Sequence, residues 1–376
     1  MNQDSSIIPD DQQEDEGDIN KEVSFKEAVV VNADWTIETI SLQIKKGNID
    51  LEPGFQRRGA WDDVRKSRLI ESIAVGMPVP NIVLAENKVH KGRFIVIDGK
   101  QRLLAISEYM NNSFPLKGLD IRKDLNGQRF SELSIDDREY LENATIRSTL
   151  IKNWTDENFL YSLFYRLNSG SLPLSPQELR KALIGGNLLD SIDHYLTVSN
   201  PFQRVFGYKL DRRMRDSELV LRFIALDSDL PSYQGDFKEF LDNTTRKFEE
   251  NWPIHVNEIM DKYQRLDLAL TTTRNLFGDD SFKKWLGDRY ERVMNRALFD
   301  AITRFFADQS VTNSILGNEI NIVEALKNLC LDPEFKDAIE RTTKSKSATF
   351  GRINKWGEVL AACIGKHYDR TSCRII

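Results

Sequence analysis

The residues best suited to chemistry lie at one junction, where an apolar run meets an acidic residue and a basic cluster. Residues 94–97 are apolar and partly β-branched, which is typical of a buried strand, and Asp98-Gly99 breaks the run. Apolar residues then recur at helical spacing, so the sequence predicts a helix that begins near Lys100. A strand that passes through Asp-Gly into a helix leaves unpaired backbone N–H groups at the helix start.

Such a helix start suits a phosphate or another anion. Gly99 allows a ligand to approach the backbone closely, while Lys100, Gln101 and Arg102 add two cations and an amide donor. Asp98 is the carboxylate at this point that could hold a divalent ion or position an attacking water. The alternative is an ordinary strand–turn–helix that is capped by Asp98 and followed by solvated charges.

A second basic cluster, Arg57-Arg58, follows a predicted short strand, and Gln56 comes directly before it. Arginine suits a polyphosphate because its planar fork matches phosphate oxygens. The amides of Gln56 and Gln101 are suited to reading a base or a sugar. Surface arginines are more often solvated, and that interpretation stays open for Arg57.

The elements that must position these residues form a mixed α/β region followed by a helical one. The sequence predicts strands at 49–51, 81–85, 94–97 and 144–152, and helices at 36–46, 64–75 and 135–143. Ser175, Pro176 and Glu178 carry the signature of a capped helix start. Strand signals vanish after residue 190, and helical patterns cover 216–228, 236–250, 254–276, 282–308, 320–328 and 347–366.

Length and composition indicate a soluble globular protein with two domains. The chain has 376 residues, of which 40% are hydrophobic and 29% are charged. We expect a disordered acidic tail at 1–24, an α/β domain at 25–190 and a helical domain at 191–376. The net charge of −6 comes from the tail and does not describe the folded part. The first 22 residues hold eight acidic residues and one lysine, a charge of −7, so the remainder has a charge of +1. An anionic partner is therefore compatible with the folded part.

The sequence argues against several locations and chemistries. We find no apolar run of the roughly 20 residues that span a bilayer and no signal peptide, so we expect a cytoplasmic protein with no membrane partner. The three cysteines and four histidines fit neither a disulfide framework nor a zinc site. Neither a P-loop nor a G-x-S-x-G elbow occurs. Asp98-Gly99-Lys100 does copy the D-x-K fragment of a common nuclease core, without a second acidic ligand that we can place.

Two basic patches in the helical region are candidates for contact with nucleic acid. Basic residues interleaved with aromatics can bind the phosphate backbone and stack bases. The alternative is an ordinary solvated face above core aromatics. The patches comprise Arg212, Arg213 and Arg215 in the first case, and Lys344, Lys346, Arg352 and Lys355, interleaved with Phe350 and Trp356, in the second.

Several motifs in a fixed order resemble a known family. They are F-Q-R…W (residues 55–61), G-x-P-x-P (76–80), I-D-G-K-Q-R (97–102) and R-L-N-S-G…L…Q-E-L-R (166–180). The set resembles the ParB/sulfiredoxin-like domain of GmrSD-type and SspE-type restriction proteins. Helical segments at 212–223, 235–241 and 295–302 are also similar to that family.

The resemblance implies an α+β fold with a nucleotide site, followed by an all-α domain. In the family the D-G-Q-Q-R signature is part of that site, which implies such a role for Asp98, Gly99, Gln101 and Arg102, and for Arg57 of F-Q-R. Trp61, Asn168 and Glu178 belong to matching motifs and are expected to line or support the same cleft. Lys100 departs from the usual glutamine. No His-Me nuclease signature occurs, and no cysteine lies near the motifs for reductase chemistry.

Three functions follow as hypotheses. The first is a regulatory protein of prokaryotic anti-phage defence or DNA restriction that binds a nucleoside triphosphate with Mg²⁺. Some members of the family hydrolyse the nucleotide, and hydrolysis is compatible with this hypothesis. Its partners would be the nucleotide, DNA and a separate nuclease or defence subunit, and a homo-oligomer is compatible with it. The second is a metal-dependent DNA nuclease that uses Asp98. The third is a DNA-binding or assembly module without enzymatic activity.

Overall fold

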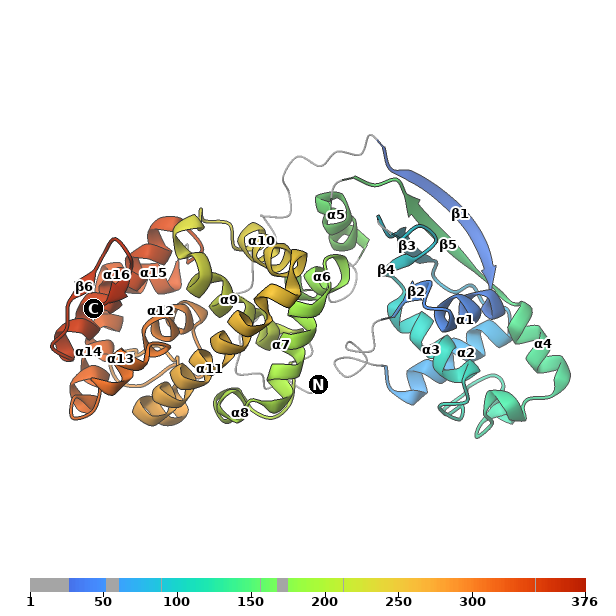
Figure 1. Ribbon diagram of the computed structural model, residues 1–376. Coiled ribbons are helices and arrows are strands. Elements are labelled where there is room, and N and C mark those ends of the chain that lie inside the picture. The colour runs from blue at the N-terminus through green and yellow to red at the C-terminus, as the bar shows by residue number, and fades with distance from the viewer. Residues whose placement is uncertain are drawn as a thin grey trace. The chain divides into compact units, whose positions relative to one another are not determined.

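A computed structural model describes residues 27–51, 61–88, 90–155, 157–167, 175–211, 213–341 and 343–376 (Figure 1). Two compact units meet in the chain between residues 174 and 175, whereas the sequence analysis places the domain boundary after residue 190. The difference arises because the helix that begins after Ser175 packs on helices of the second unit. An α+β first region followed by a mainly helical one confirms the predicted fold class.

A mixed sheet forms the centre of the first unit. The described residues give it five strands in the order β1-β5-β3-β4-β2. Neighbours pair antiparallel in β1–β5 and β3–β4, and parallel in β3–β5 and β2–β4. The strands are β1 (Val29–Thr36), β2 (Ile49–Asp50), β3 (Ile82–Glu86), β4 (Phe94–Asp98) and β5 (Thr145–Lys152).

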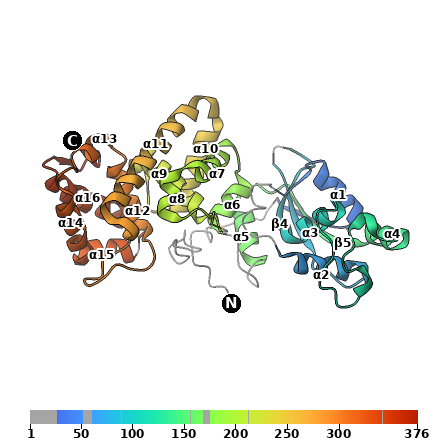
Figure 2. The same ribbon diagram turned by 90° about the horizontal axis from the view of Figure 1, so that it is seen from below.

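Helices cover both faces of this sheet. Ile82 and Leu84 of β3 belong to the core under α1, α2 and α3, while the alternate residues Val83 and Ala85 are buried on the other face. In both views α5 lies on the side of β4 away from α3 (Figures 1 and 2). The helices are α1 (Ile37–Lys45), α2 (Asp63–Ala74), α3 (Lys100–Met110), α4 (Ile135–Asn143) and α5 (Glu157–Leu167), with 3₁₀ turns at Lys123–Leu125 and Phe130–Glu132.

The second unit is built around the long helices α9, α11, α12 and α16. They share one apolar core, and α12 packs on the other three. Its helices are α6 (Pro176–Leu183), α7 (Asn187–Val198), α8 (Asn200–Phe206), α9 (Arg215–Asp229), α10 (Phe237–Glu250), α11 (Trp252–Phe277), α12 (Arg296–Phe306), α13 (Gln309–Asn313), α14 (Glu319–Leu331), α15 (Pro333–Glu340) and α16 (Lys346–Cys363), with 3₁₀ turns at Leu230–Ser232 and Gly278–Asp280.

The structure corrects the sequence analysis at two places in this unit. The helix expected over 282–308 is wrong in its first half, because Trp285 and Tyr290 form an antiparallel bridge there and α12 begins only after Asn295 caps it. The region is also not entirely helical. A two-stranded ribbon of β6 (Tyr368–Asp369) and β7 (Arg374–Ile375) follows α16.

Candidate functional site at the β4–α3 junction

A glycine in the left-handed conformation joins β4 to α3. Gly99 has φ +94°, and a Cβ there would lie 2.6 Å from Cγ2 of Ile82 on the neighbouring strand. The left-handed region disfavours residues with a side chain, and this site also lacks room for one. The predicted junction is therefore confirmed, but the capping residue is Gly99 and not Asp98, and no side chain caps the helix.

Arg102 is held across this turn. Its Nη2 donates to Oδ2 of Asp98 at 2.7 Å and to the backbone carbonyl of Asn81 at 3.1 Å. Asp98 and Arg102 have an i,i+4 spacing, and the side chains are 15% exposed for Arg102 and 32% exposed for Asp98. Nε of Arg102 is buried and has no acceptor among the described residues. The guanidinium is thus oriented by two acceptors and retains donor capacity.

The first turn of α3 presents its backbone donors at the same place. The first backbone bond within the helix joins N–H of Leu103 to the carbonyl of Gly99, so the amides of residues 100–102 precede the helical ladder. Partial positive charge accumulates at such a helix start. Lys100 is half-buried here and already has a contact within the chain. The backbone amides that begin α3 and the Arg102 guanidinium therefore lie at the same end of this helix.

Gln101 forms a contact that the sequence analysis did not predict. Its Oε1 accepts a hydrogen bond from the backbone N–H of Trp61 at 3.0 Å, immediately before Asp62 caps α2. The indole of Trp61 in turn lies under the Arg65 guanidinium, 4.7 Å from the ring centroid. Gln101 and Trp61 thus tie the starts of α2 and α3 together. This places both residues beside the junction as supports.

A polar row that the sequence analysis missed extends from the junction across the sheet. Nδ2 of Asn81 donates to Oγ1 of Thr149 at 3.2 Å, and that hydroxyl donates to Oδ1 of Asn32 at 3.1 Å. Asn81 directly precedes β3, Thr149 lies on β5 and Asn32 lies on β1. Their alignment depends on a strand order that is not sequential, so no local motif could have revealed it.

The remaining members of the predicted site are three residues that the structure does not describe and Glu178. Gln56, Arg57 and Asn168 fall outside the described residues. Glu178 lies in the second unit, where its Oε2 accepts from the backbone N–H of Ser175 at 2.7 Å and completes the predicted capping box. Glu178 therefore stabilises the start of α6.

Asp98 brings one carboxylate to this junction. Among the described residues, no group of three or more His, Cys, Asp or Glu side chains could hold a metal ion. A cage built from protein ligands alone does not fit what the structure shows of the junction. One carboxylate does fit Mg²⁺ that arrives with phosphates, because such an ion keeps several waters and needs one or two protein carboxylates.

Most of the predicted nucleic-acid residues are engaged in the second unit. Arg352 is completely buried and bonds to Asp300 at 3.0 Å, and Arg215 is 3% exposed and pairs with Asp211 at 2.7 Å. Burial alone would raise the pKa of Asp211, but the contacts with Arg215 outweigh it and lower that pKa. Guanidinium groups so enclosed cannot reach a phosphate backbone, so we do not retain Arg215 and Arg352 as contact residues.

The other basic residues are more accessible. Arg213 lies 3.8 Å from Glu178, and Lys355 pairs with Asp332 at 2.5 Å and with Glu334 at 2.7 Å. Lys346 is exposed and bonds to Gln234, Lys344 is half-buried, and Arg212 falls outside the described residues. The expected aromatic Trp356 is fully buried and cannot stack on a base. The described part of the two patches therefore does not form a continuous basic surface with exposed aromatics.

Comparison with known proteins identifies the segment that contains the junction. Residues 37–185 match the family model of the GmrSD restriction endonuclease, N-terminal domain. This match confirms, over that segment, the family resemblance that the motifs predict. No curated protein and no solved structure matches the chain, so the ParB/sulfiredoxin-like fold stays a prediction. Among the described residues, no helix has both the length and the apolar character to cross a membrane.

Proposed function

We propose that this GmrSD-type chain binds the phosphates of a nucleoside triphosphate at the β4–α3 junction, and that this binding regulates DNA restriction. The family model that covers residues 37–185 supports the restriction role by its description. The observation that carries the nucleotide role is the position of Arg102. Two acceptors fix its guanidinium beside the start of α3, at a turn that only glycine fits.

The junction has the parts that a phosphate site needs. Backbone N–H groups at a helix start form directed donors for anionic oxygens. Arginine bonds phosphate through a planar fork with more than one N–H group. Because Nη2 of Arg102 donates to Asp98 and Asn81, the other N–H groups of its guanidinium would bind the phosphate. Gly99 lets the phosphate approach the backbone without meeting a side chain.

Asp98 has two roles in this proposal. Its Oδ2 orients Arg102, and the carboxylate stands where an ion brought by the nucleotide would need a protein ligand. Mg²⁺ would supply charge neutralisation across the phosphates. Where turnover follows binding, Asp98 is the carboxylate that would orient the attacking water. DNA cleavage is assigned to a separate nuclease that this chain controls, which extends the partner hypothesis.

Titration calorimetry with ATP, GTP and CTP, each with and without Mg²⁺, tests the proposal on the full chain. We expect saturable binding of at least one nucleotide to the wild type. Arg102→Ala should weaken it at least about tenfold, since a charge-assisted contact to phosphate contributes more than 1.4 kcal/mol in a desolvated site.

Arg68→Ala is the matched control, because Arg68 is a solvated arginine of the same unit whose Nη2 lies 3.4 Å from Asp120. It should leave the affinity unchanged. Equal binding by the wild type and Arg102→Ala would exclude the junction as the phosphate site. Absence of binding for all three nucleotides would reject the nucleotide role altogether.

A further inference from the structure

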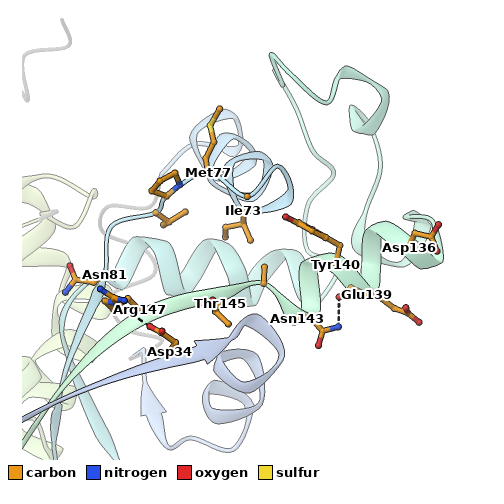
Figure 3. A pocket seen from close by; sticks show the side chains of 14 residues that line it. Asp34, Ile73, Met77, Asn81, Asp136, Glu139, Tyr140, Asn143, Thr145 and Arg147 are labelled. Atoms are coloured by element: carbon orange, nitrogen blue, oxygen red, sulfur yellow. Dashed lines mark hydrogen bonds and ion pairs between the residues drawn. The ribbon is translucent and has the colours of Figure 1, made fainter.

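A large groove lies beside the junction in the first unit and shares Asn81 with the proposed phosphate site. It has a volume of about 1130 Å³ and lies between the loop at residues 76–81, helix α4 and the strands β1 and β5 (Figure 3). Asn81 is common to both places, since it lines the groove and its carbonyl holds Arg102.

The walls of the groove expose large apolar side chains. Met77 is 48% exposed on the loop and Tyr140 is 54% exposed on α4. Figure 3 shows these two side chains on different walls, with Ile73 between them. Exposed apolar side chains gathered around one concavity are typical of a surface that binds a partner.

The loop wall is held in place by its sequence. Gly76 has φ +71°, and a Cβ there would lie 3.0 Å from the Tyr140 hydroxyl, so the loop approaches α4 closely. Pro78 and Pro80 restrict the backbone that follows. This accounts for the G-x-P-x-P motif, which the phosphate site does not use. A groove that is rigid before binding reduces the entropic cost of association.

The rim of the groove is acidic. Its charged residues are Asp34, Asp136, Glu139 and Arg147, and three carboxylates against one guanidinium give a formal charge of −2. Arg147 lies 3.4 Å from Asp34, so these two largely neutralise one another. Asp136 and Glu139 form no ion pair with any residue that the structure describes. The uncompensated charge therefore lies on α4.

The negative charge on α4 indicates which kind of ligand the groove would bind. Phosphates of a nucleotide or a nucleic acid would be repelled by the two uncompensated carboxylates. A segment with lysine or arginine would be attracted by them, and apolar neighbours in that segment would bury Met77 and Tyr140. The volume exceeds what one side chain fills, which favours several consecutive residues of a polypeptide.

We propose that the groove between residues 76–81 and α4 binds a polypeptide segment of a separate protein, in which basic residues alternate with apolar ones. Met77 and Tyr140 contact the apolar residues of that segment. Asp136 and Glu139 pair with its basic residues. This surface stands independently of nucleotide binding, because none of these four residues belongs to the β4–α3 junction.

Selection from a displayed library of random dodecapeptides on the full chain provides the probe. Peptides enriched on the wild type are then synthesised with a fluorescent label, and their affinity is measured by anisotropy. We expect the enriched peptides to carry a net positive charge together with apolar residues. The double variant Asp136→Asn/Glu139→Gln should lower their affinity about tenfold, which corresponds to two exposed ion pairs, and the effect should shrink at high salt.

A second variant, Met77→Ser, tests the apolar wall and should also weaken binding. The control Asp120→Asn/Glu142→Gln makes the same change of charge outside the groove, with Glu142 on the same helix, and should bind like the wild type. Circular dichroism confirms that each variant is folded.

Enrichment without a bias toward basic residues would overturn the proposal. Affinities that the groove variants leave unchanged would do the same. If a twelve-nucleotide oligothymidylate binds the wild type but not the groove variants, the surface binds nucleic acid, which would contradict the proposal.

Discussion

Nη2 of Arg102 lies 2.7 Å from Oδ2 of Asp98 and 3.1 Å from the carbonyl oxygen of Asn81. One guanidinium nitrogen thus joins the end of β4, the first turn of α3 and the start of β3. Asn81 continues this connection to β5 through Thr149. The predicted anion site is therefore part of a polar network that reaches β5, and Asn81 of this network also lines the groove.

Gly99→Ala should destabilise the first unit by about 1–3 kcal/mol, because a side chain at φ +94° is strained and its Cβ would lie 2.6 Å from Ile82. Urea denaturation followed by circular dichroism measures the change. Gly92→Ala is the control, since Gly92 has φ +81° but nothing within 4 Å of an added Cβ. A loss at Gly99 no larger than that at Gly92 would show that the turn has room for a side chain.

The junction could be predicted from sequence because its signals are local. A β-branched run, Asp-Gly and a helical repeat are all contained within residues 94–109, and Asp98 and Arg102 are four residues apart, a spacing that allows a pair. The contact of Arg102 with Asn81 could not be predicted, because it depends on β3 lying next to β4. The pairing of Gln101 with Trp61 has the same origin in tertiary structure.

Other elements were missed for different physical reasons. β1 has the run Val29–Val31 exposed on an edge strand, so it lacks the alternation that marks a half-buried strand. The segment before α12 has many apolar residues but contains Gly287 at φ +106°, which interrupts a helix. The sequence suggests that the basic residues near α9 and α16 lie on the surface. In the structure Arg215 and Arg352 are instead buried and form ion pairs.

Asp300→Asn should destabilise the second unit by about 3–5 kcal/mol. Asp300 is fully buried and pairs with Arg222 at 2.5 Å and with Arg352 at 3.0 Å. Loss of its charge removes a carboxylate from two buried guanidinium groups, of which Arg222 keeps only Glu218, at 3.8 Å, among the carboxylates that the structure describes. Thermal and urea unfolding of the full chain measure this loss.

Asp288→Asn serves as the surface control for that measurement, because Asp288 is 76% exposed and lies 3.8 Å from Arg289. We expect no measurable change there. Equal stability of the two variants would mean that the buried network contributes no more than a solvated pair.

Asp227 should make the second unit sensitive to acid. Burial would raise the pKa of Asp227, but the ion pairs with Lys262 and Arg265 outweigh it and lower that pKa from 3.8 to about 2. Since the folded pKa lies below the unfolded one, the stabilisation of about 2 kcal/mol is present above pH 4 and is lost as the pH falls toward 2.

The variant Asp227→Asn isolates this contribution. The difference in unfolding free energy between the wild type and the variant should be largest near pH 6 and should shrink by pH 3. Urea titrations at the two pH values measure it. A difference that is constant with pH would show that Asp227 does not carry the acid response.

The most direct test of the nucleotide role is an amide spectrum of the full chain by transverse-relaxation-optimised NMR during titration with a non-hydrolysable nucleoside triphosphate and Mg²⁺. The account predicts saturable shifts for the backbone N–H groups of Gly99, Lys100, Gln101 and Arg102, and their absence in Arg102→Ala. Saturable shifts confined to residues away from the β4–α3 junction would contradict it.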